Sequence, residues 1–117
     1  RGLGDVYKRQ VWSPAEAFPE GVNVEFVRQV GRTHVQMRVF ERGVGETLSC
    51  GTGTVAVAAV MARRTGDLGP WRVDVPGGRI TVELAQSQNG EVLASLTGPA
   101  VLVAQGEVHI PDEAVSR

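Results

Sequence analysis

The chain of 117 residues has a single cysteine, Cys50, so no disulfide can form within it. A lone cysteine is typical of proteins kept in a reducing compartment. No apolar run approaches the length that crosses a bilayer, and no apolar segment typical of a secretory signal stands near the N-terminus. The formal net charge is only −1, which gives no indication of a nucleic-acid or membrane-surface partner. We therefore expect a soluble, cytoplasmic protein.

Lysine and tyrosine are equally scarce, because Lys8 and Tyr7 are the only ones in the chain. Both lie in the first ten residues (RGLGDVYKRQ), which resemble translated adapter sequence, whereas every other Lys or Arg position holds arginine. We expect residues 1–10 to be a foreign leader on a gene truncated upstream. A disordered natural tail is the alternative. Residues 11–117 are expected to form one domain.

Strand patterns dominate this domain. Residues 22–30 are rich in β-branched side chains, and residues 35–39 alternate between apolar and polar, so both are expected to be strands joined by a hairpin at Gly31-Arg32. Residues 76–78 (PGG) are typical of a turn. Further strands are expected at residues 71–75, 80–84, 91–97 and 100–108.

One helix is expected at residues 54–64 (TVAVAAVMARR), with Thr52 or Thr54 as its N-cap and Gly66 after its end. Its first two turns are apolar on every side, so we expect it to be buried all round. About six strands around one buried helix give an α+β domain. Its sheet is expected to be curled, mostly antiparallel and barrel-like around the central helix.

Residues 41–53 (ERGVGETLSCGTG) contain four glycines and are expected to form a structured loop. Cys50 stands at its end, just before the helix. Free N–H groups and the dipole of a helix start stabilise an anion and favour a reactive thiolate. A carboxylate could dock on the N–H groups of Gly51 and Thr52 while the sulfur of Cys50 reaches the adjacent α-carbon. The alternative is a buried, inert cysteine.

Three further polar residues are candidates for binding. Glu41 and Arg42 stand side by side at the start of the glycine-rich segment, where they could hold an ammonium and a carboxylate of a zwitterion. Asn23 lies early in an apolar strand, where asparagine is disfavoured. Taken singly, these residues also fit a solvated strand end and a strand start.

The motifs together resemble the C-terminal domain of diaminopimelate epimerase. The resemblance is carried by NVEFV (23–27), RVFERGVGET (38–47) and CGTG (50–53), and it continues through PGG (76–78) and TGPA (97–100). It runs from about residue 17 to residue 108. ERGxGET followed by CGTG is highly specific, and NVEFV with SCGTGTVAVA is most similar to the actinobacterial branch.

This resemblance implies a two-domain enzyme with pseudo-twofold halves, each a β-structure around a central helix. Two cysteines, one in each half, would face opposite sides of the substrate's α-carbon and interconvert LL- and meso-diaminopimelate, on the route to lysine and peptidoglycan. No cofactor and no metal are implied. The N-terminal domain would be the missing partner, so we expect the fragment alone to be inactive. Homodimers are what the family suggests.

The resemblance also assigns roles to the candidate residues. Cys50 would be one of the two acid/base groups, and Gly51 and Thr52 would bind the reacting carboxylate through backbone N–H groups. The distal amino-acid centre of the substrate would be held by Asn23, Glu41 and Arg42.

Three alternatives remain open on the residues. A cofactor-independent racemase of the proline racemase type is compatible with CGTGT, although it would not need Glu41 and Arg42. A cysteine hydrolase would need a histidine beside Cys50, and neither His34 nor His109 has a supporting signature. A non-catalytic domain that binds an anion or an amino acid is the third.

Overall fold

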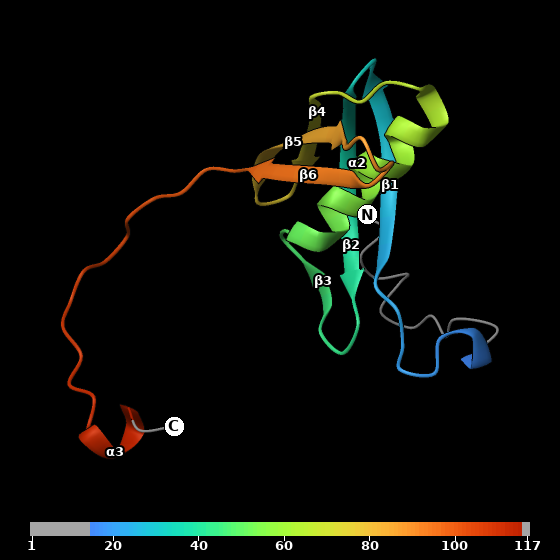
Figure 1. The fold of residues 1–117 in the computed structure, drawn as a ribbon. Coiled ribbons are helices and arrows are strands. Elements are labelled where there is room, and N and C mark those ends of the chain that lie inside the picture. Colours follow the sequence, from blue (N-terminus) through green and yellow to red (C-terminus); the bar gives the residue numbers. More distant parts are fainter. Residues whose placement is uncertain (1–14, 116–117) are drawn as a thin grey trace.

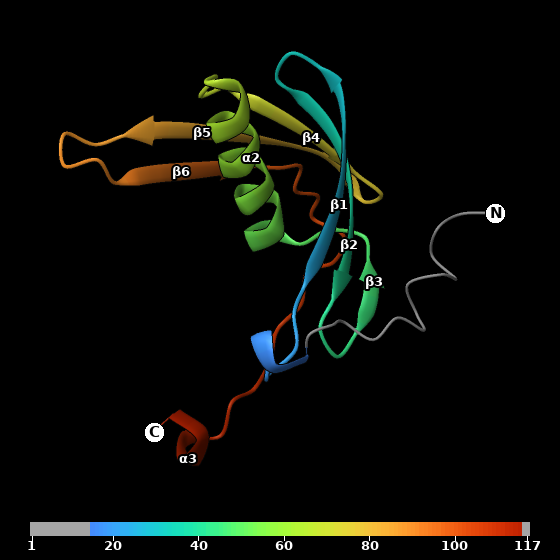
Figure 2. The ribbon, with the colours of Figure 1, turned by 90° about the vertical axis from the view of Figure 1, so that its right-hand side faces the viewer.

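Six strands form one sheet, and a helix of 15 residues, α2, packs against one of its faces (Figures 1 and 2). The computed structural model describes residues 15–115, so the expected leader, residues 1–10, lies outside the described residues. The elements are η1 (Ala15–Ala17), β1 (Val24–Gly31), β2 (His34–Glu41), β3 (Gly45–Thr47), α2 (Gly51–Thr65), β4 (Trp71–Val75), β5 (Gly78–Gln86), β6 (Val92–Thr97) and α3 (Asp112–Val115).

The strands are ordered β1-β2-β4-β5-β6, and β3 pairs with the end of β2. Only β2 and β4 pair in parallel, because α2 crosses between them, while every other pair is antiparallel. The expected α+β class with a mostly antiparallel sheet is therefore confirmed. The sheet is not closed into a barrel, since β1 and β6 each lack a second partner strand among residues 15–115.

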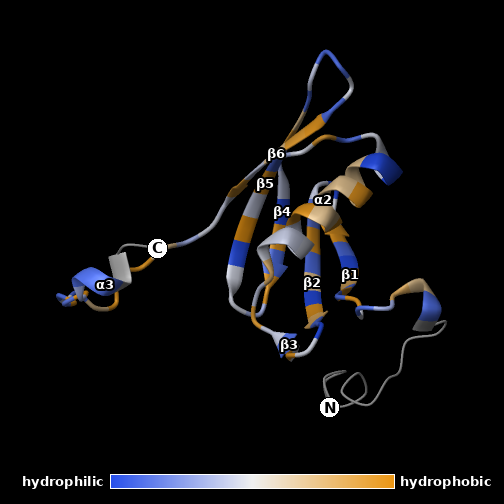
Figure 3. Cartoon of the chain, turned by 60° about the horizontal axis from the view of Figure 1, so that its bottom comes forward, coloured by the Kyte–Doolittle hydropathy of each residue, from blue (hydrophilic) through white to orange (hydrophobic). Residues whose placement is uncertain are grey.

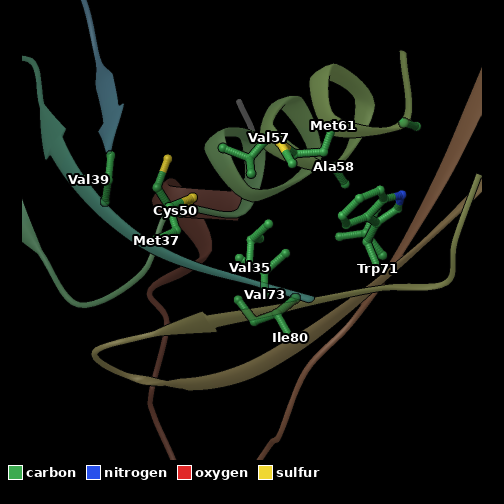
Figure 4. Close-up of a cluster of buried hydrophobic side chains, with 12 residues drawn as sticks. Val35, Met37, Val39, Cys50, Val57, Ala58, Met61, Trp71, Val73 and Ile80 are labelled. Atoms are coloured by element: carbon green, nitrogen blue, oxygen red, sulfur yellow. The ribbon is translucent and has the colours of Figure 1, made fainter. Parts of the chain in front are cut away.

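The core lies between α2 and the sheet, as the alternation of apolar residues predicts. Along β2, Val35, Met37 and Val39 are buried, and the alternating bands along this strand are visible in Figure 3. Trp71 and Val73 of β4 meet them under the helix (Figure 4). Burying side chains of this size contributes about 1.5–3 kcal/mol each, which fixes α2 on the sheet.

Helix α2 begins at Gly51, three residues earlier than expected, and its N-cap is Cys50 rather than Thr52 or Thr54. Thr54 lies inside the first turn, where its hydroxyl donates to the Cys50 carbonyl oxygen at 2.7 Å. Threonine is a good N-cap in general, and an expectation based on residue type alone therefore put the start of the helix too late. The end of the helix is as expected, because Gly66 is the left-handed C-cap, with φ 77°.

The helix is not buried all round. Ala56 and Val60 are exposed, and the exposed fraction of Val60 is 57%. An open sheet covers only one side of α2, so an apolar helix keeps a bare stripe on the other side. Among residues 15–115, no helix is long and apolar enough to span a membrane.

Two segments differ from the expected pattern. Residues 41–53 are not one loop, because β3 lies within them and pairs Thr47 with Val39 of β2. The expected strand at residues 100–108 is wrong. Residues 100–111, here called the arm, carry no regular structure and run away from the body in an extended conformation (Figure 1). Alternation predicts a strand only where a neighbouring strand offers hydrogen bonds, and residues 15–115 offer the arm none.

Candidate active site

Cys50 holds the junction between the glycine-rich segment and helix α2. Its backbone is extended, with φ −138° and ψ 111°, and its side chain makes no capping hydrogen bond to the helix. The residue is 8% exposed and lies beside Met37 and Val39 at the rim of the core (Figure 4). Its Sγ stands 3.5 Å from the Thr52 Oγ1. The core thus fixes the position of the thiol at the first turn of α2.

The first turn of α2 presents unused hydrogen-bond donors next to this thiol. Thr54 closes the turn, since its backbone N–H donates to the Cys50 carbonyl at 2.9 Å. Within the described part of the chain, nothing accepts a hydrogen bond from the backbone N–H groups of Gly51 and Thr52, and both residues are exposed. Such N–H groups, with the helix dipole behind them, bind a carboxylate.

The side chain of Glu25 on β1 packs closely against Gly53 in this turn. A Cβ placed on Gly53 would lie 2.6 Å from the Glu25 Oε1, well inside contact distance. The carboxylate of Glu25 forms no hydrogen bond or ion pair among residues 15–115. Sequence analysis singled out the glycine but missed its partner, because the contact depends on how β1 and α2 are placed in space.

Asn23, Glu41 and Arg42 come together where the β1–β2 hairpin opens. The Asn23 Oδ1 accepts a hydrogen bond from the backbone N–H of Arg42 at 2.8 Å. The Arg42 guanidinium turns toward Glu20, where its Nη1 donates to the carbonyl oxygen at 3.0 Å. Asn23 lies just before β1 rather than within it, and from there it fixes the backbone of its neighbour. The structure therefore groups all three residues.

Thr47 joins this group to the loop that carries Cys50. Its Oγ1 donates to the Glu41 Oε2 and also lies 3.4 Å from the Ser49 carbonyl oxygen. Thr47 can hold this place because β3 pairs it with Val39, which lies two residues before Glu41 on β2. No hydrogen bond joins Cys50 to Asn23, Glu41 or Arg42 among residues 15–115. The site therefore has two parts, which Thr47 joins through the loop that carries Cys50.

A small hollow lies on the other side of the same loop. It has a volume of about 190 Å³ and is lined by Ser49, by Gly77 and Gly78 of the β4–β5 turn, and by Leu96 and Pro99 among others. The Gly77 N–H donates to the Leu48 carbonyl at 2.9 Å, which ties that turn to the loop. The PGG motif identified the turn, but nothing in the sequence placed it against Leu48 in the loop that leads to Cys50.

The histidine that a cysteine hydrolase needs is not beside Cys50. His34 points to the outer face of the sheet, where its Nε2 lies 2.6 Å from the Asp74 Oδ2. The Arg79 guanidinium donates to the same carboxylate at 2.6 Å. Together Arg79 and then His34 lower the pKa of Asp74 to about 2. His109 lies in the exposed arm. Among residues 15–115, no cluster of His, Cys, Asp and Glu could hold a metal ion.

Comparison with known proteins decides the family. The diaminopimelate epimerase family model matches residues 6–103. The chain belongs to the diaminopimelate epimerase family. It is 51% identical over 111 residues to the diaminopimelate epimerase of Streptomyces coelicolor and 50% identical over 96 residues to that of Thermobifida fusca. Similarity to actinobacterial enzymes agrees with the resemblance seen in the sequence motifs.

The match to these relatives covers much of this chain and a minor part of theirs. It spans 89% of this chain and 37% of the Streptomyces coelicolor enzyme, and 92% of this chain and 38% of the Corynebacterium glutamicum enzyme, which is 45% identical. The chain therefore spans little more than a third of the length of the relatives it matches.

A solved structure supports the fold alone. The crystal structure of the Bacillus anthracis phenazine biosynthesis protein of the PhzF family aligns with a TM-score of 0.50 over 63% of this chain and 25% of its own. The two sequences are 24% identical over that region. The arrangement of one helix against a mixed sheet is thus shared beyond the family to which the chain belongs.

Proposed function

We propose that this chain is the C-terminal domain of a diaminopimelate epimerase, comprising residues 11–117, and that it supplies half of the active site. The whole enzyme would interconvert LL- and meso-diaminopimelate without a cofactor, on the route to lysine and peptidoglycan. The observation that carries the proposal is the position of Cys50 at the N-cap of α2, beside the unused N–H groups of Gly51 and Thr52.

These residues support a proton transfer at the substrate's α-carbon. The Cys50 thiolate would take the α-proton, forming an S–H bond while the electron pair of the C–H bond moves toward the carboxylate. The N–H groups of Gly51 and Thr52 would donate to the carboxylate oxygens, where negative charge increases during the step. A thiol on the opposite face would then return a proton to the α-carbon. In the reverse direction the two sulfur atoms exchange roles.

The second part of the site would hold the distal centre of diaminopimelate. The Glu41 carboxylate, oriented by Thr47, would bind the distal ammonium. Arg42 uses its Nη1 on the Glu20 carbonyl, which leaves its other guanidinium N–H groups for the distal carboxylate. Asn23 would fix the backbone of Arg42 in place. A substrate with one amino-acid centre would lack the interactions with Glu41 and Arg42.

The chain has one cysteine, so the second acid/base group would come from the N-terminal domain. We therefore expect the chain alone to be an inactive half-enzyme. The same requirement defines its partner in the complete enzyme, a domain that closes the cleft over Cys50 and excludes water.

The test is deuterium exchange at the α-carbon. The purified chain would be incubated with LL-diaminopimelate in heavy water, alone and with the separately expressed N-terminal part of the Streptomyces coelicolor relative, and NMR would follow α-hydrogen loss and meso product. We expect no exchange by the chain alone and Cys50-dependent exchange when the N-terminal part is present. Exchange that survives in Cys50→Ala would contradict the role of this thiol.

Two controls separate an effect on catalysis from an effect on substrate binding. Arg42→Gln should raise KM for diaminopimelate with a smaller effect on kcat, whereas Arg72→Gln, on the exposed outer face of β4, should change neither. Proline and monoamino acids should show little exchange with the assembled enzyme. Rapid exchange of proline would favour the alternative of a proline racemase type.

A second candidate function is binding without catalysis, and the presence of a single cysteine favours it. In that case diaminopimelate would shift the amide NMR signals of Gly51 and Thr52 in the isolated chain, and no exchange would appear with any partner. Binding in both forms, followed by exchange only in the assembled one, would instead support the enzyme.

A further inference from the structure

The side chain of Thr47 stands between the two parts of the candidate site. β3 pairs Thr47 with Val39, so Thr47 and Glu41 lie on the same face of the sheet as diagonal neighbours on adjacent strands. The Thr47 Oγ1 donates to the Glu41 Oε2, and the same oxygen lies 3.4 Å from the Ser49 carbonyl oxygen. Because Ser49 directly precedes Cys50, one hydroxyl contacts both the Glu41 carboxylate and the peptide group that joins Ser49 to Cys50.

This hydroxyl has two acceptors and a single proton to donate. The Glu41 carboxylate is the nearer acceptor, and a carboxylate accepts more strongly than a backbone carbonyl. Among residues 15–115, the Glu41 carboxylate makes no other hydrogen bond or ion pair. An ammonium group bound there would neutralise the carboxylate and make it a weaker acceptor. The Ser49 carbonyl would then compete for the proton of Thr47.

The backbone on both sides of Thr47 is held in place, so its hydroxyl can turn without moving β3. On the opposite face of the strand, Glu46 accepts hydrogen bonds from the Arg38 Nε at 2.5 Å and Nη2 at 2.7 Å. The Leu48 carbonyl accepts from the Gly77 N–H at 2.9 Å. Only the short segment between Leu48 and α2 is therefore left to respond when the hydroxyl turns (Figure 2).

We propose that Thr47 is a positioning residue that makes proton transfer at Cys50 depend on the occupation of Glu41. The inference rests on the proposed function, in which Glu41 binds the distal ammonium of diaminopimelate. When that ammonium binds, the Thr47 hydroxyl turns its proton from the Glu41 Oε2 to the Ser49 carbonyl oxygen, and no covalent bond changes. The new hydrogen bond fixes the peptide group before Cys50, and with it the position of the thiol against the α-carbon.

The same arrangement discriminates between substrates in the chemical step. A substrate with one amino-acid centre places no ammonium on Glu41, so the Thr47 proton stays on the carboxylate and the segment before Cys50 stays unfixed. Such a substrate has a low kcat as well as a high KM. Binding energy from the distal end of diaminopimelate is thus used to orient the group that reacts at the other end.

The first experiment titrates the complete chain with methylammonium chloride. A monoamine can occupy Glu41 but has no carboxylate to bind the N–H groups of Gly51 and Thr52, and sodium chloride at the same concentration controls for ionic strength. NMR follows the Glu41 carboxyl carbon and the amide nitrogen of Cys50, which shares its peptide group with the Ser49 carbonyl. We expect both signals to shift with the same dependence on methylammonium concentration.

Matched variants separate the hydroxyl from the rest of the Thr47 side chain. Thr47→Val keeps the β-branched shape and removes the hydroxyl, so the Glu41 signal should still respond while the Cys50 signal stays in place. Thr47→Ser should restore the Cys50 response. Thr81→Val makes the same change on β5, where the threonine side chain forms no hydrogen bond among residues 15–115, and should leave both responses unchanged.

The same variants should divide kcat from KM in the assembled enzyme. Thr47→Val should lower kcat for diaminopimelate about tenfold with a smaller change in KM, because the hydroxyl acts after the substrate is bound. Thr47→Ser should recover most of the lost kcat, and Thr81→Val should change neither constant. A residue that only stabilised β3 would not produce this division or its recovery by serine.

Two results would overturn the proposal. The Cys50 amide nitrogen could stay in place while the Glu41 carboxyl signal titrates in the wild-type chain, or Thr47→Val could respond as the wild type does. A Glu41 signal that ignores methylammonium would refute distal binding by Glu41 and this inference with it. Absence of α-hydrogen exchange by the assembled wild-type enzyme would count against the proposed function alone, because the titration requires no turnover.

Discussion

The two ends of helix α2 are built in opposite ways. At the C-terminal end, Gly66 turns the chain with φ 77°, and its N–H donates to the Ala62 carbonyl at 2.8 Å. The Thr65 hydroxyl donates to the Met61 carbonyl at 2.8 Å. The Ala62 carbonyl, one of the four that a helix end leaves without a helical partner, is therefore satisfied by the protein itself.

At the N-terminal end the protein leaves its donors unused. Cys50 has the extended backbone of an N-cap but makes no side-chain hydrogen bond to the helix, and the N–H groups of Gly51 and Thr52 have no acceptor among the described residues. Serine, threonine, asparagine or aspartate at this position would cap the helix. A thiol is a poor cap and a good proton acceptor, so stability is given up where the proposed chemistry takes place.

The largest effect we predict concerns Trp71, which anchors the C-terminal end of α2. Trp71 is fully buried, and its Nε1 donates to the Asp67 carbonyl at 2.9 Å in the loop that follows α2. Trp71→Ala should lower the free energy of unfolding by about 3–5 kcal/mol in urea titrations. Trp71→Phe keeps most of the apolar contact and loses the hydrogen bond, so it should cost clearly less. Equal losses for both variants would show that the hydrogen bond, rather than burial, holds this end.

A smaller loss should follow from changing the C-cap. Gly66→Ala places a Cβ in the left-handed region, which costs about 1–2 kcal/mol. The matched control is Gly106→Ala in the arm, where φ is not positive and no atom lies within 4 Å of the added Cβ. Urea titration of the two variants should show destabilisation for Gly66→Ala alone. An unchanged Gly66→Ala protein would mean that the helix end can rearrange at no cost.

How far the sequence predicts this molecule depends on how local the signal is. Gly66 was placed as the C-cap because a left-handed end needs glycine, a preference of one residue. The start of α2 was misplaced because two threonines suit an N-cap better than Cys50 does. Alternation predicted the β2, β4 and β5 faces correctly and failed for residues 100–108, since a strand also requires a partner that the described residues lack.

The sequence predicted which residues belong to the candidate site, but it did not predict the contacts that join them. Taken singly, Cys50, Glu41 and Arg42 each fit an ordinary structural role, and they became candidates because they stand together around one glycine-rich segment and match a family motif. Thr47 was missed as the link between Glu41 and the Cys50 loop, and Glu25 as the neighbour of Gly53. Both depend on pairing between strands, or between strand and helix, that no run of residues encodes locally.

The N-terminal end of α2 should become more stable when Cys50 is replaced by a residue that caps a helix better. Cys50→Ser puts a hydroxyl where it can accept a hydrogen bond from the first turn, so we expect about 0.5–1 kcal/mol more stability than for Cys50→Ala in thermal unfolding. Both variants should lose any exchange activity of the assembled enzyme. A serine variant no more stable than the alanine variant would show that the first turn is already satisfied, which would remove the contrast between the two ends.

The smallest effect we predict is a loss of stability at low pH that is confined to the C-terminal end of α2. The pKa of Asp67 lies below its ordinary value, first because its carboxylate accepts a hydrogen bond from the Gly69 N–H at 3.1 Å and second because Arg32 donates to it at 2.9 Å. A lowered pKa means that the ionised form stabilises the fold above about pH 4 and that this contribution is lost as the pH falls further.

Exchange of the Trp71 indole N–H should therefore accelerate in acid, because its acceptor is the Asp67 carbonyl. Asp67→Asn should flatten that dependence, whereas Asp112→Asn, exposed in α3, should not. An indole signal whose exchange follows the same acid profile in the Asp67→Asn protein would assign the sensitivity to global unfolding instead of to the end of α2.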